Sequence, residues 1–149
     1  MTRLTDSQLA EAMAKPWRNT PKAISNQSSF EFEIPGRMPG LNDYDAQHLH
    51  LQAAGLLKKK WTKTVALLAK ASAKGCQYQT IRADIQWIEP NKRRDKDNIA
   101  FAKKFIFDGL VSAGIIPNDG WANIAGWTER FEVDARNPRV VVTVINVDG

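Results

Sequence analysis

The sequence has little of several features that would assign a protein to a familiar class. It contains one cysteine, Cys76, which excludes an intramolecular disulfide and fits a reducing compartment. Cys76 is most simply interpreted as a small buried hydrophobic residue. No apolar run approaches the roughly 20 residues that a membrane-spanning helix needs, and the first 15 residues lack the apolar block of a signal peptide. We therefore expect a soluble cytoplasmic protein without a membrane partner.

Several motifs of nucleotide, redox and hydrolytic chemistry are also missing. The chain has no P-loop, no G-x-G-x-x-G pattern and no C-x-x-C pair, and no Ser-His-Asp arrangement stands out. Its two histidines, His48 and His50, would diverge at the start of a helix, which argues against a shared metal. What the chain does have is positive charge: the net charge is +5 and the pI is about 9.5. Such a balance favours a polyanionic partner without identifying one.

The length of 149 residues fits one domain, here 30–149, preceded by an extension over 1–29. The extension contains a possible short helix over 5–14, followed by Pro16, Pro21 and a polar run over 25–29 that break regular structure. It is either a flexible tail or an arm that packs on a partner subunit or on DNA. Alternating and helical hydrophobic periods predict the order β-α-β-α-β-β in the domain. The expected strands are 30–34, 79–88, 124–133 and 139–147, and the expected helices are 46–74 and 98–113.

The last two strands flank a turn sequence at 134–138, so we expect them to form a hairpin. The fold class is then α+β, with two helices packed on a mixed four-stranded sheet. The first helix carries Lys59, Lys63, Lys70 and Lys74 on one stripe. That stripe is either a solvated face or a surface that follows a phosphate backbone.

The most informative stretch is the polar loop 91–97, which ends in Asp95-Lys96-Asp97. In an extended loop, residues two apart point to the same side, so both carboxylates would face one point. Two carboxylates this close favour a cation between them, and Mg²⁺ takes one or two carboxylates together with water and phosphate oxygens. The neighbouring cations are suited to phosphate contacts; they are Lys92, Arg93, Arg94 and Lys96. The alternative is a solvated loop whose acids balance its bases.

Two later positions extend this pattern. Lys104 lies on nearly the same face of the second helix as Asp97, where it would reach a phosphate or stabilise charge in a transition state. The alternative for Lys104 is an i,i+4 ion pair with Asp108. Asp119, in the turn Asn118-Asp119-Gly120, is a third carboxylate that is either returned toward the first two or part of an ordinary turn.

The run Arg94-Asp95-Lys96-Asp97-Asn98, with Lys104, Phe107-Asp108-Gly109-Leu110, Gly114 and Asp119-Gly120, resembles the core signature of RusA-like crossover junction endodeoxyribonucleases. The resemblance covers about 30–147, and only 93–120 is specific. It implies a Mg²⁺-dependent Holliday junction resolvase of DNA recombination and repair, with Mn²⁺ as a substitute. It further implies a homodimer on four-way DNA junctions. A non-catalytic DNA- or junction-binding protein is the alternative, and a phosphoryl-transfer enzyme acting on small nucleotides is a second rival.

The resemblance assigns the catalytic, metal-binding carboxylates to Asp95, Asp97 and Asp119, and the active-site lysine to Lys104. Two departures bear on the lysine and on the closing turn. Some family members carry the lysine one turn after the D-x-D-N motif, where this chain has Phe101, so Lys103 is a rival and otherwise a DNA contact. Many members have two acids at the closing turn, whereas Asn118 stands at the first position here.

Overall fold

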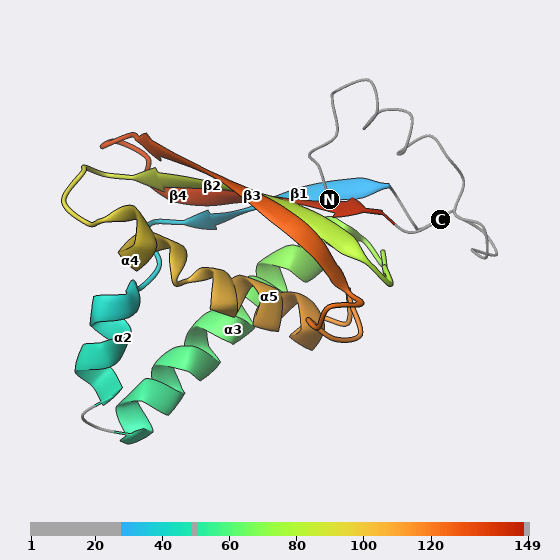
Figure 1. The fold of residues 1–149 in the computed structure, drawn as a ribbon, viewed down its shortest axis with the longest axis horizontal. Helices are drawn as coiled ribbons and strands as arrows, with labels where there is room; N and C mark the ends of the chain where they lie inside the picture. Colours follow the sequence, from blue (N-terminus) through green and yellow to red (C-terminus); the bar gives the residue numbers. More distant parts are fainter. Residues whose placement is uncertain (1–27, 49–50, 148–149) are drawn as a thin grey trace.

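The computed structural model describes residues 28–48 and 51–147, in which four strands form one sheet and the helices lie on one side of it (Figure 1). The strands are β1 (Ser29–Pro35), β2 (Ile81–Glu89), β3 (Ile124–Val133) and β4 (Arg139–Asn146). The helices are α2 (Leu41–His48), α3 (Leu51–Ala73), α4 (Lys96–Ala100) and α5 (Lys103–Ser112). The predicted α+β class with a mixed four-stranded sheet is confirmed. The predicted extension 1–29 and its short helix lie almost entirely outside the described residues.

The strand order is β1-β4-β2-β3, and this order contradicts the predicted hairpin. β4 pairs antiparallel with β1 and with β2, whereas β2 and β3 pair in parallel. β2 therefore lies between the two strands that we expected to be neighbours. The backbone N–H of Asp134 donates to the carbonyl of Glu89 at 2.9 Å, so the turn after β3 passes over the end of β2. β2 has a neighbouring strand on each side and is buried along most of its length, with only Asp84 and Gln86 partly exposed.

The helix predicted over 46–74 is two helices, and the first begins at Leu41. Gly40 provides the reason, because its backbone N–H donates to the carboxylate of Asp43 at 2.9 Å while its carbonyl accepts from Tyr44 at 3.1 Å. This is the reciprocal half of a capping box, which starts a helix just after Gly40.

The helix predicted over 98–113 is also two helices, which meet at Phe101 and Ala102. The bonds there join residues three apart: the N–H of Ala102 donates to Ile99 at 3.3 Å and that of Lys104 donates to Phe101 at 3.2 Å. Such tight turns change the direction of the helix axis. The ring of Phe101 packs against Tyr44 at 5.2 Å and Phe105 at 5.8 Å between centroids, which holds the break in place.

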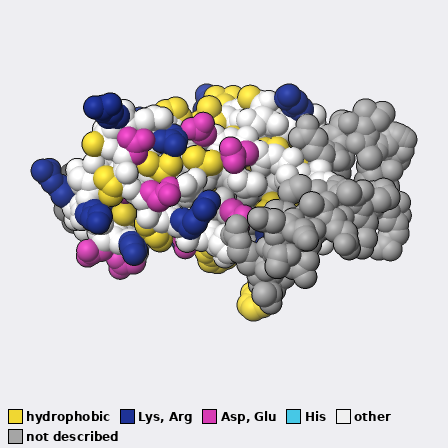
Figure 2. Space-filling view, turned by 90° about the horizontal axis from the view of Figure 1, so that it is seen from above, with side chains coloured by type: hydrophobic (Ala, Val, Ile, Leu, Met, Phe, Trp, Pro, Cys, Tyr) yellow, Lys and Arg dark blue, Asp and Glu magenta, His cyan; other side chains and the backbone are white. Residues whose placement is uncertain are grey.

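The core lies between the sheet and the paired helices α3 and α5. Gly109 of α5 allows the close approach, since a Cβ there would lie 2.4 Å from Val65 of α3. Figure 2 views the face of the sheet that the helices leave uncovered, and both signs of charge are interspersed on its described part. Among the described residues, no helix has the length and apolar character needed to cross a bilayer.

Candidate active site

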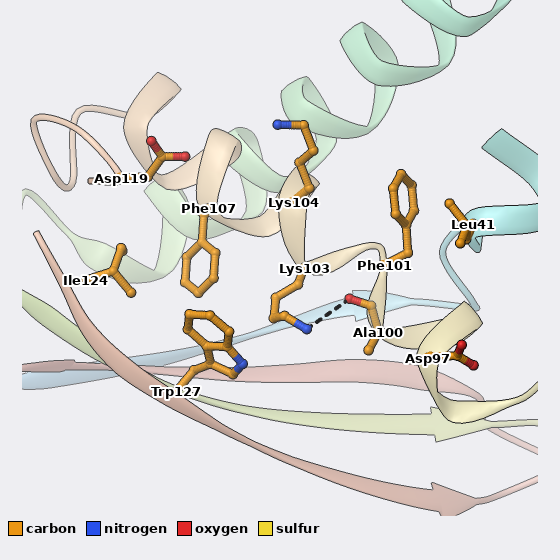
Figure 3. Close-up of a pocket in the computed structure, with 10 residues that line it drawn as sticks. All are labelled: Leu41, Asp97, Ala100, Phe101, Lys103, Lys104, Phe107, Asp119, Ile124 and Trp127. Atoms are coloured by element: carbon orange, nitrogen blue, oxygen red, sulfur yellow. Dashed lines mark hydrogen bonds between the residues drawn. The ribbon is translucent and has the colours of Figure 1, made fainter. Parts of the chain in front are cut away.

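A pocket of about 540 Å³ lies between α5 and the edge strand β3 (Figure 3). It collects residues from the start of α2, from α4 and α5, from the loop after α5 and from β3. The lining residues are Leu41, Asp97, Ala100, Phe101, Lys103, Lys104, Phe107, Asp119, Ile124 and Trp127. Four of the residues singled out from the sequence are therefore brought to one pocket: two of the three acids and both candidate lysines.

The charged residues are spread along this pocket rather than gathered at one point. In Figure 3, Asp119 lies at one end and Asp97 at the other, with Lys103 and Lys104 between them. The walls are aromatic and aliphatic, and the rings of Phe107 and Trp127 lie 5.6 Å apart. The pocket therefore suits a ligand that combines negative charge with flat apolar groups, as a nucleotide chain does.

Lys103 is held by the protein itself. Its Nζ donates to Glu129 of β3 at 3.1 Å and to the carbonyl of Ala100 at 3.2 Å, and it lies 5.4 Å from the centre of the Trp127 ring. Glu129 also accepts a hydrogen bond from Nε1 of Trp87 at 3.0 Å. Lys103 therefore has a fixed position with its charge already compensated.

Lys104 points the other way and is freer. Its side chain is 54% exposed, and its contact with Asp108 is a long one at 3.9 Å. Oδ2 of Asp108 is buried and has no hydrogen-bond partner. The i,i+4 pair that we weighed for Lys104 is present, but its ammonium group keeps most of its donors for a ligand.

Only the first acid of the D-x-D motif has the extended backbone that we expected. Asp95 is the N-cap of α4, with φ −69° and ψ 153°, and Asp97 is already inside that helix. Asp95 lines a second pocket of about 840 Å³, and Asp97 borders both pockets. Asp97 also accepts from the backbone N–H of Asn98 at 3.0 Å. The described residues contain no group of three acids, histidines or cysteines close enough to hold a metal ion.

Arg94, which we assigned to DNA contact from the sequence, is turned inward. Its guanidinium donates to both carboxylate oxygens of Glu89 at 3.1 and 2.8 Å and to the carbonyl of Met38 at 3.0 Å. The side chains of Arg94 and Glu89 are 10% and 6% exposed. Arg94 thus ties the D-x-D loop to β2 and to the segment before α2.

Asn98, on the other side of the two acids, also binds the segment around the start of α2. Its Oδ1 accepts from the backbone N–H of Asn42 at 2.9 Å. Gly40 passes so close that a Cβ would lie 2.5 Å from that Oδ1 and 2.9 Å from Nη1 of Arg94. Arg94 and Asn98 therefore fix the position of the two acids between them.

The remaining cations of the loop behave as the sequence suggested for a solvent-facing surface. The side chains of Lys92, Arg93 and Lys96 are exposed. Lys96 also lies 5.6 Å from the centre of the Phe131 ring, beside the second pocket. All three cations are therefore exposed on the side where an anionic partner would meet the loop.

Sequence reasoning missed two acids that organise the site, Glu89 and Glu129. Glu89 continues the inward-facing alternation of Ile85 and Trp87, and an acid at a core-facing position signals a buried partner. Glu129 lies between Trp127 and Phe131 on the inward side of β3. The same alternation would have found it.

Comparison with known proteins adds no assignment. No protein-family model matches the chain, and no curated protein matches it. The family resemblance therefore rests on the motif between Arg94 and Gly120 alone.

Proposed function

We propose that this chain is a Mg²⁺-dependent endodeoxyribonuclease that resolves four-way DNA junctions in recombination and repair, in the cytoplasm. The observation that carries the proposal is the shared pocket. Asp97 and Asp119 are separated by two helix segments in the sequence, yet both line it together with Lys103 and Lys104. Acids for a metal, cations for a phosphate and apolar walls for bases are the groups that phosphodiester hydrolysis uses.

The donor set fits Mg²⁺ in part. Asp95 and Asp97 are both exposed and lie two residues apart at the start of α4. Mg²⁺ needs only one or two protein carboxylates beside water and phosphate oxygens. Asp119 is a third ligand only if it approaches the pair, since the described residues hold no three-acid cluster. When bound, the metal would polarise a phosphoryl oxygen and lower the pKa of a bound water. Mn²⁺ prefers the same oxygen donors and would substitute.

The other groups have separate tasks. Lys92, Arg93 and Lys96 are exposed and would contact backbone phosphates, whereas Arg94 positions the loop that carries the acids. Lys104 lines the pocket with a half-exposed ammonium group whose contact with Asp108 is long, and it would stabilise charge on the phosphate. Resolution of a four-way junction needs two symmetric cuts, so the proposal includes a two-fold homodimer.

Incubation with a synthetic four-way junction, with and without Mg²⁺, tests the proposal. We expect cleavage only with metal, and we expect Asp95→Asn and Asp97→Asn to abolish it while DNA binding is kept or improved. Each change removes a ligand and also a negative charge that repels phosphate. Asp119→Asn decides the third ligand: normal cleavage by that variant would remove Asp119 from the site.

A non-catalytic junction-binding protein is the second candidate, and one observation favours it. The described residues have no ready three-acid metal site, while their exposed cations would bind DNA without one. Binding of the junction without any cleavage in Mg²⁺ or Mn²⁺ would select this candidate. Turnover of free mononucleotides would instead select a small-molecule phosphoryl-transfer enzyme.

A further inference from the structure

Helix α3 has a charge composition that the proposed active site does not use. Its 23 residues include five lysines and no acid. The chain has no aspartate or glutamate at all between Asp45 and Asp84. A helix whose lysines merely solvate a surface usually carries acids as well, because i,i+4 pairs of opposite charge stabilise it and like-charged neighbours do not.

Three of the five lysines of α3 belong to one series along the helix, Lys59 lies at its border, and Lys58 lies on the other side. Positions spaced alternately four and three residues apart share a helix face, and such a series of exposed residues runs along this one. Its members are Leu56, Lys60, Lys63, Leu67, Lys70 and, just after the helix, Lys74. We call this series the α3 stripe. At 1.5 Å per residue, its four lysines span roughly 20 Å.

The opposite side of α3 is committed to the core. Val65, Ala69 and Ala73 are buried there, and Val65 touches Gly109 of α5. The α3 stripe therefore points away from α5 and from the sheet. α3 packs along α5, the helix that carries Lys104, and both helices lie on the same side of the sheet (Figure 1).

We propose that the α3 stripe is a second DNA-binding surface, which follows the phosphate backbone of a duplex arm of the bound DNA. This inference rests on the proposed function for the identity of its polyanion. A row of single cations along one line matches the regular row of charges on a duplex. A lipid surface fits less well, because an interfacial helix needs a continuous apolar face. The stripe has only two apolar residues, Leu56 and Leu67, and these lie three helical turns apart.

The experiment measures DNA binding and not cleavage, in EDTA, with a fluorescent duplex and a four-way junction between about 50 and 200 mM salt. The variants are Lys63→Ala, Lys70→Ala and a triple variant in which Lys60, Lys63 and Lys70 are all changed to alanine. The control is Lys58→Ala, which removes the same charge from an exposed position of the same helix. Lys58 points about 140° around the helix axis from Lys63, away from the stripe. Alanine favours the helix, so each variant keeps the fold, and thermal unfolding by circular dichroism verifies this.

Each stripe lysine that contacts a phosphate should lower the slope of log affinity against log salt by about 0.9 when removed. At 0.15 M salt that corresponds to a loss of affinity of roughly fivefold per lysine, for all DNA sequences alike. Lys58→Ala should change the slope by much less. Equal slopes for the triple variant and the unchanged protein would overturn the inference, and so would equal losses from Lys58→Ala and Lys63→Ala.

The outcome separates this inference from the proposed function. If Asp97→Asn abolishes cleavage and Arg93→Ala weakens binding while the stripe variants bind normally, the nuclease proposal stands and the α3 surface is refuted. If the stripe variants lose DNA binding in a protein that cuts nothing, the surface stands and the nuclease is refuted. Loss of binding to anionic vesicles with unchanged DNA binding would assign the stripe to a membrane surface and refute the inference.

Discussion

At the scale of single residues, Arg94 is the clearest case of a cation that serves the fold. Its guanidinium makes two hydrogen bonds to Glu89 and one to Met38, with little exposure to solvent. Arg94→Ala leaves the Glu89 charge buried without a partner, so we expect it to reduce the free energy of unfolding by about 3–5 kcal/mol. Urea unfolding followed by circular dichroism measures this loss.

The adjacent Arg93→Ala is the matched control, because it removes the same charge from an exposed side chain. Its effect on stability should stay within about 0.5 kcal/mol. Changing Arg94 and Glu89 together to methionine should recover much of the loss, since no unpaired charge then remains. Equal urea midpoints for Arg94→Ala and Arg93→Ala would show that the inward pair does not hold the loop.

The two lysines of the pocket should respond differently to removal. Lys104 has one long contact and a half-exposed side chain, so Lys104→Ala should lower the junction cleavage rate by about 10²–10³ with little change in affinity. If Lys104 only pairs with Asp108, the effect is a stability loss of roughly 0.2–0.5 kcal/mol with cleavage intact. Lys103→Ala, run beside it in single-turnover assays, removes a lysine already paired with Glu129. A selective rate loss at Lys103 would reverse the assignment.

At the scale of elements, the contact between α3 and α5 depends on Gly109. A Cβ there would lie 2.4 Å from Val65, so Gly109→Ala should destabilise the protein by about 1–3 kcal/mol. Gly55→Ala in α3 is the control, because nothing lies within 4 Å of its Cβ position and alanine favours a helix by about 0.5–1 kcal/mol. The double variant Gly109→Ala, Val65→Ala should lose less free energy of unfolding than the sum of the losses of the two single variants, and strict additivity would exclude the clash.

Elements with a strong local signal could be predicted from the sequence, and their partners could not. The alternation in Phe30, Phe32 and Ile34 located β1 to within a residue, since burial of alternate side chains is a local property of a strand. The short turn at 134–138 predicted a hairpin, but β4 pairs with β1 and β2 instead, because a turn sequence does not by itself determine which strands become neighbours in the sheet. The start of α2 and the break between α4 and α5 were missed because the capping bond at Gly40 and the aromatic packing of Phe101 form in the folded protein.

The site shows the same division between local and distant information. The motif located the charged residues of the pocket, including Asp97, Lys104 and Asp119, but not its walls Leu41 and Trp127. It could not show that Arg94 faces inward, because a run of four neighbouring cations gives no sign of which one has a buried acid within reach. Nor could spacing alone reveal that Asp97 lies inside α4 and Asp95 before it.

At the scale of the whole molecule, β4 holds the sheet together, because it pairs with β1 on one side and β2 on the other. Truncation after Pro138 removes both pairings and the buried Val140, Val142 and Val144. We expect the shortened chain to lose its cooperative thermal transition and most of its near-ultraviolet circular dichroism. A sharp, two-state melting curve for the truncated chain would contradict this role of β4.

The place of β4 also determines the order in which the molecule assembles during synthesis. Thr143 of β4 donates to Glu31 of β1 across 112 residues of sequence. β1 is therefore synthesised long before the strand that pairs with it, and its apolar face has no partner strand beside it until β4 has been made. β2 and β3 are able to pair earlier, and β4, the last of these four strands to be made, then inserts between β1 and β2. Pairings this distant in sequence form slowly, so the newly made chain is exposed to aggregation for longest at β1.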